Sequence, residues 1–87
     1  MKLKKELISR EIAGERFLVP VGKSVYDANG LFFLTAVGEF LWDRLAEAQG
    51  VEDLLKAVLE EYDVEESVAR KDITSFLEKL RLLEIID

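Results

Sequence analysis

The stretch DANGLFFLTAVGEFLWDRL, residues 27–45, decides the fold that this sequence predicts. Asn29-Gly30 is a turn signal, and four consecutive apolar residues follow it, Leu31–Leu34. Thr35 can cap a helix that begins directly afterwards. A short strand that leads straight into a helix is expected to be the last strand of its sheet. The backbone groups on its outer edge would then have no partner within the chain, which raises the question of what pairs with them.

Two further strand signals precede this stretch. Leu7–Ile12 and Glu15–Val21 are separated by Ala13-Gly14, a two-residue link that can form a tight hairpin turn. Apolar residues recur at every second position of the second run, so one face of it is consistently apolar. Pro20 has no amide hydrogen, which places it near the end of the strand or facing away from a neighbour. With the run at Leu31–Leu34, these signals predict three strands.

Three helical patterns follow. The first begins after Thr35, and the second extends from about Val51 to Tyr62 with its apolar residues in helical register. The third opens with a capping box, in which Asp63 is the cap and Glu66 lies three residues on. Its predicted core stripe consists of Ala69, Ile73, Phe76, Leu80 and Leu83.

The order β-β-β-α-α-α predicts the fold class. We expect an α+β domain with a three-stranded antiparallel sheet followed by three helices that pack over one face of it. Such a domain resembles a winged helix-turn-helix with its hairpin placed first. Residues 1–87 contain no linker, internal repeat or low-complexity segment, so we expect a single domain.

The third helix has two margins beside its core stripe. At 100° per residue, one margin carries Arg70, Thr74, Leu77 and Arg81, so that two guanidinium groups lie beside a leucine. The other margin carries Asp72, Ser75 and Lys79. The sequence alone leaves open which of the two faces the third strand.

The composition argues against catalysis and against a metal site. The chain has no cysteine and no histidine, which removes thiol ligands, the commonest metal ligand and the usual general base. We therefore expect no enzymatic activity, no metal and no cofactor. The amino-terminal residues lack the apolar core of a signal peptide, and no run approaches 18 apolar residues. The expected location is the cytoplasm, without a membrane span.

Net charge bears on the rival functions. The chain carries a net charge of −6, and residues 35–87 hold fourteen Asp and Glu against six Lys and Arg. A domain this acidic has no overall attraction for phosphates, so nucleic acid is not an expected partner. Two alternatives remain open: a winged-helix DNA-binding module, and a structural module that forms a homodimer through the edge of the third strand.

Several segments in a fixed order resemble one known family. They are EIAGERFLVPVG (Glu11–Gly22), NGLFFL (Asn29–Leu34), GEFLWDRL (Gly38–Leu45), VEDLLKAVLEEYDV (Val51–Val64) and ARKDITSFLEKLRLLEII (Ala69–Ile86). Together they resemble the PqqD-like proteins, also called recognition elements for RiPP (ribosomally synthesised and post-translationally modified peptide) precursors. The resemblance covers nearly the whole chain, from about Leu7 to Ile86.

The resemblance implies a function. A single PqqD-like peptide-binding domain over residues 1–87 would bind the leader of a precursor peptide as a strand added to the third strand, in a cleft bordered by the third helix. It would then present the peptide to a modifying enzyme, often a radical S-adenosylmethionine enzyme, in quinone-cofactor synthesis or another pathway. The predicted peptide-binding residues are Leu31, Phe32, Phe33, Leu34, Arg70, Ile73, Thr74, Leu77 and Arg81.

Overall fold

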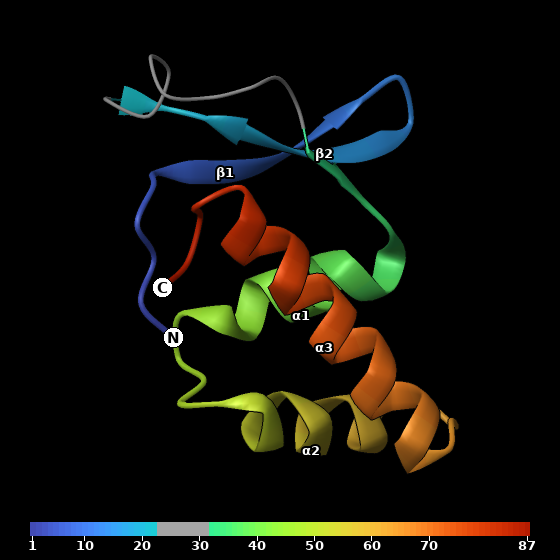
Figure 1. The fold of residues 1–87 in the computed structure, drawn as a ribbon. Helices are drawn as coiled ribbons and strands as arrows, with labels where there is room; N and C mark the ends of the chain where they lie inside the picture. Colours follow the sequence, from blue (N-terminus) through green and yellow to red (C-terminus); the bar gives the residue numbers. More distant parts are fainter. Residues whose placement is uncertain (23–31) are drawn as a thin grey trace.

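The structure is a computed structural model that describes residues 1–22 and 32–87. Three strands come first, β1 (Leu7–Ile12), β2 (Glu15–Pro20) and β3 (Phe32–Leu34), and three helices follow, α1 (Ala36–Leu45), α2 (Val51–Glu61) and α3 (Glu66–Leu82). The strands form one antiparallel sheet in the order β1-β2-β3, and the helices lie together on one side of it (Figure 1). The predicted α+β class is confirmed.

The hairpin between β1 and β2 forms at the predicted link. Ile12 pairs with Glu15, and the two residues between them, Ala13 and Gly14, have φ angles of 53° and 82°. Positive φ at both central residues is typical of the hairpin turns whose twist matches that of the strands. Pro20 is the last residue of β2, beyond the residues that pair with β3, so its missing amide hydrogen removes no bond to β3.

β3 is an edge strand, as predicted. It pairs with β2 through Arg16–Leu18 and has no other neighbour in the sheet formed by the described residues. Leu34 points to the helices and is buried, and Leu18 on β2, which pairs with Phe32, is also buried. The strand begins at Phe32, and the predicted turn at Asn29-Gly30 and the first predicted strand residue, Leu31, lie outside the described residues.

The start of α1 follows the predicted capping pattern. The amide N–H of Gly38 donates a hydrogen bond of 3.0 Å to the side-chain oxygen of Thr35. This bond closes the first turn of α1 directly after β3. The cap thereby joins the edge of the sheet to the helical layer.

The predicted capping box of α3 is wrong. The helix begins at Glu66, the residue before it is Glu65, and no side chain caps the first turn. Asp63 comes two residues earlier, in the link that follows α2, too far from the first free amides of α3 to accept from them. Glu66 instead places a carboxylate in the first turn, where the helix dipole favours negative charge.

The buried stripe of α3 also differs from the predicted one. Leu77, which we expected on an exposed margin, has no exposed surface, whereas Phe76 is only half-buried and Leu83 is 39% exposed. The helix is therefore rotated about its axis, so that its core face is centred on Ile73 and Leu77. Both residues belong to the single core that the sheet and the three helices share. The sequence pattern placed the core stripe on α3 but missed its centre.

Candidate functional site

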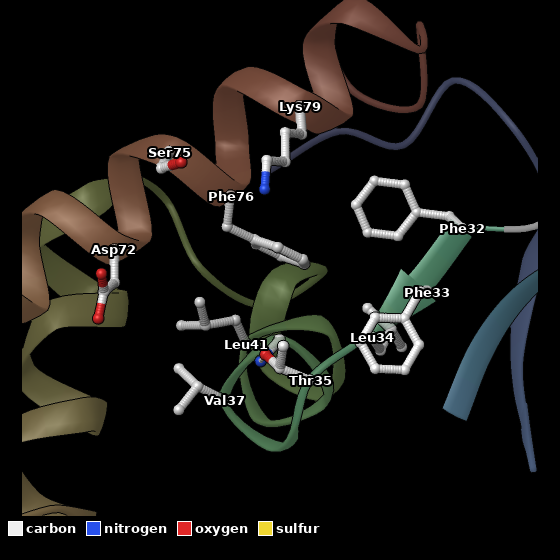
Figure 2. Close-up of a pocket in the computed structure, with 11 residues that line it drawn as sticks. Phe32, Phe33, Leu34, Thr35, Val37, Leu41, Asp72, Ser75, Phe76 and Lys79 are labelled. Atoms are coloured by element: carbon white, nitrogen blue, oxygen red, sulfur yellow. Dashed lines mark hydrogen bonds between the residues drawn. The ribbon is translucent and has the colours of Figure 1, made fainter. Parts of the chain in front are cut away.

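A cleft with a cavity volume of ≈ 330 Å³ lies between β3, the start of α1 and α3 (Figure 2). All three elements contribute to its walls, so the cleft exists only in the folded domain. Its lining residues are Phe32, Phe33, Leu34, Thr35, Val37, Gly38, Leu41, Asp72, Ser75, Phe76 and Lys79.

The cleft runs along the free edge of β3. Phe32 and Leu34 face the helices, while Phe33 lies on the outer face of the sheet and is 52% exposed. The ring of Phe33 packs edge-on against that of Phe17, with the ring centroids 5.7 Å apart. Side chains from both faces of the strand thus border the same opening. The unpaired N–H and C=O groups of the strand edge consequently open into a partly apolar space.

Two aromatic rings and a glycine shape the apolar wall. The ring of Phe32 meets that of Phe76 on α3 edge-on, with centroids 6.2 Å apart. Gly38 is buried beneath them, and a methyl group added there would lie 3.5 Å from the Phe76 ring and 3.4 Å from Leu34. These neighbours are side chains. The tightest of these contacts would be with the capping oxygen of Thr35, at 3.3 Å, whereas the distances to Leu34 and Phe76 are those of ordinary contact.

Charged side chains of α3 lie before and after Phe76 along the helix. Asp72 and Lys79 are both exposed, and Ser75 lies between them. Figure 2 shows Lys79 towards the Phe32 end of the cleft and Asp72 towards the Val37 end. Neither charged side chain takes part in an ion pair or a side-chain hydrogen bond with any other residue that the structure describes. Both are available to a bound molecule.

The structure brings only some of the predicted site residues together. Phe32, Phe33 and Leu34 line the cleft, and Leu31 lies outside the described residues. Ile73 and Leu77 have no exposed surface and belong to the core, so a peptide in the cleft cannot touch them while the domain is folded.

The predicted arginine margin of α3 lies away from the cleft. Arg70 donates to both carboxylate oxygens of Glu52 on α2, at 2.7 and 3.4 Å. Arg81 donates to the main-chain carbonyl of Asp87 at 3.1 Å, and Thr74 lies on a separate shallow surface that also includes Arg70. The margin of α3 that faces β3 is therefore the one with Asp72, Ser75 and Lys79. The helical spacing of these residues around Phe76 was the sequence signal that could have identified this margin.

The ion pair between Arg70 and Glu52 shifts the pKa of both residues. The pKa of Glu52 lies below its ordinary value, first because Arg70 donates a hydrogen bond to the carboxylate and second because of the guanidinium charge. The pKa of Arg70 is raised by the same contacts. Because Glu52 already occupies the Arg70 guanidinium, this arginine holds α3 to α2.

The described residues form neither a metal site nor a membrane-spanning helix. Within residues 1–22 and 32–87, no group of three or more acidic side chains is placed to hold a metal ion. No helix of the described chain is long and apolar enough to cross a membrane.

The family follows from comparison with known sequences. The model of the family described as coenzyme PQQ synthesis protein D (PqqD) matches residues 15–86. The chain belongs to the PqqD family. The matched residues include β3 and α3, which border the cleft. The resemblance drawn from the sequence is confirmed. No curated protein matches the chain.

A solved structure is similar to this PqqD-family chain over its full length. It is described as TbiB1 in complex with the TbiA(beta) leader peptide, and it shares 28% sequence identity with a TM-score of 0.74. The similarity covers 100% of this chain and 95% of that one. The three-strand, three-helix architecture is thus shared with a protein that was solved with a leader peptide.

Proposed function

We propose that this protein binds the leader segment of a ribosomally made precursor peptide as an extra strand on the free edge of β3. The observation that carries the proposal is the position of that edge, which opens into a cleft with an apolar wall and a charged border. The PqqD-family match and the similarity to a leader-peptide complex support it. An added strand satisfies the backbone groups of β3, and the side chains of the cleft select the sequence.

The bound leader would be presented to a separate modifying enzyme. The chain has neither histidine nor cysteine, so the covalent chemistry is assigned to that enzyme, for which a radical S-adenosylmethionine enzyme is our candidate. The domain then contributes binding energy and position. Holding the leader raises the effective concentration of the attached core peptide at the enzyme.

An amide chemical-shift titration tests the site. The probe is the leader of a candidate precursor peptide, sought among the short open reading frames beside this gene, and it is added to the isotope-labelled protein. We expect the largest shifts at Phe32–Leu34 and along Asp72–Lys79. Shifts confined to α2 or to the β1–β2 hairpin would contradict the proposal, and a mass that rises with protein concentration alone would favour a homodimer at the same edge.

Methylated peptides test whether the leader binds as a strand. N-methylation removes the N–H donor, and in a strand every second N–H points to the neighbouring strand. Two versions of the leader are compared, methylated at alternate positions and offset by one residue. We expect one version to lose binding and the other to retain most of it. Equal affinities for both would exclude strand addition.

A further inference from the structure

The two ends of the cleft differ in charge. Asp72 lies at the end near Val37, and Lys79 lies at the end near Phe32, where β3 begins (Figure 2). They are seven positions apart on α3, which corresponds to about 10 Å along the helix axis. Both side chains are exposed, and neither is paired with another described residue. A peptide in the cleft would therefore meet a negative charge at one end and a positive charge at the other.

The strand periodicity determines which peptide positions meet these charges. In a strand paired with β3, every second side chain points towards α3, as Phe32 and Leu34 do. Three inward positions span five residues, and the first and third are about 13 Å apart along the strand, which long charged side chains can match to the separation on α3. The middle inward side chain would meet the apolar wall of Phe76 and Leu41.

The direction of the peptide follows from the sheet. Both existing strand pairs are antiparallel, and the antiparallel ladder is the more stable per residue. β3 runs from the Lys79 end to the Asp72 end of the cleft (Figure 2). An antiparallel peptide therefore runs the other way, and it reaches Asp72 first and Lys79 last.

We infer that this cleft selects leader peptides by charge order: a basic residue, then an apolar residue two positions later, then an acidic residue two positions after that. The inference rests on the proposed function and adds the sequence class of the peptide. The basic side chain pairs with Asp72, the apolar one packs on Phe76, and the acidic one pairs with Lys79. A peptide with the reversed order places like charges together at both ends.

Selection from a peptide library tests the inference. A displayed library of random 15-residue peptides is selected against the protein and against the double variant D72K/K79D, which exchanges the two charges and keeps the net charge. The matched control is K71E/E78K. Lys71 and Glu78 are also exposed on α3 and also seven residues apart, but they lie outside the cleft.

The expected result is an inversion of preference. The wild-type protein and the control enrich the basic–apolar–acidic order, and the exchanged variant enriches the reverse. Synthetic peptides of equal composition in the two orders should differ in affinity on the order of tenfold, because two attractive pairs replace two repulsive ones at an exposed site. Circular dichroism checks that all three proteins are folded.

Two results would overturn the inference. One is a selection without any preferred charge order, and the other is the same order from the wild-type protein and the exchanged variant. The leader titration described above distinguishes failure of the charge-order inference from failure of the proposed function. If the leader shifts the amides of β3 and α3 while the charge order has no effect, the cleft binds peptides and only the charge selection is wrong.

Discussion

One side of α3 faces the cleft beside β3 with Asp72, Ser75 and Lys79, whereas the other carries Arg70 and Thr74 away from it. Both sides are polar, charged and exposed, and by composition the side with arginine is the better candidate for binding a carboxylate. The difference between them is their surroundings. Arg70 already has a carboxylate partner on α2, while Lys79 has no ion-pair partner among the described residues. A charged group serves binding only where an open surface lies beside it and no internal partner occupies it.

The largest effect on stability is expected at Leu77, which lies in the buried stripe of α3. Leu77→Ala should lower the free energy of unfolding by about 2–5 kcal/mol, because it leaves a cavity in a fully buried site. Leu82→Ala is the control, since Leu82 is 84% exposed, and its effect should stay within about 0.5 kcal/mol. Urea unfolding followed by circular dichroism measures both. Equal effects would show that Leu77 is not a core residue.

On the cleft side, Phe76→Ala should lower affinity for the leader peptide on the order of tenfold, because it removes the apolar wall opposite Phe32. Its stability loss should be smaller than that of Leu77→Ala, since Phe76 is only half-buried. Thr74→Ala on the other side of the helix should leave affinity unchanged. Fluorescence anisotropy with a labelled leader measures both, and a loss at Thr74 would reverse the assignment of the two sides.

A charge comparison should give a smaller effect. Lys79→Glu should weaken binding of a leader that carries an acidic residue by roughly two- to fivefold, as expected for exposed ion pairs. Lys71→Glu changes the net charge equally but lies outside the cleft, so its effect should be close to none. The difference should shrink at high salt, because exposed charges are screened. A difference that survives 1 M salt would argue against an ionic origin.

The smallest effect on stability and affinity is expected at the ion pair between Arg70 and Glu52. Arg70→Gln should leave peptide affinity unchanged and lower stability slightly at neutral pH. Arg70 lowers the pKa of Glu52 from 4.5, so the pair stabilises the fold above that value, and this contribution disappears as the pH falls through the lower pKa of the folded state. Unfolding curves of the two proteins should therefore differ at pH 7 and converge in acid. A loss of peptide affinity would place Arg70 in the binding site.

The sequence by itself determined the elements and their order. Ala13-Gly14 lies between two strand patterns, and only a tight turn with positive φ connects them, so the hairpin follows from local chemistry. Thr35 accepts from the third residue after it wherever a helix begins there, and that cap is local as well. The short apolar run before Thr35 marked the edge strand, and the family resemblance then predicted that a leader peptide pairs with it.

Only the tertiary structure decided which side of α3 faces that edge. Helical periodicity places Arg70 and Lys79 on opposite margins, but it does not set the rotation of the helix about its axis. That rotation is set by the core, in which Leu77 and Ile73 pack together with the side chains of the sheet and of the other helices. The elements beside each margin then decide its role: α2, with Glu52, lies beside Arg70, and β3 and α1 lie beside Asp72, Ser75 and Lys79. Packing among residues far apart in the sequence determines this arrangement, and local sequence does not record it.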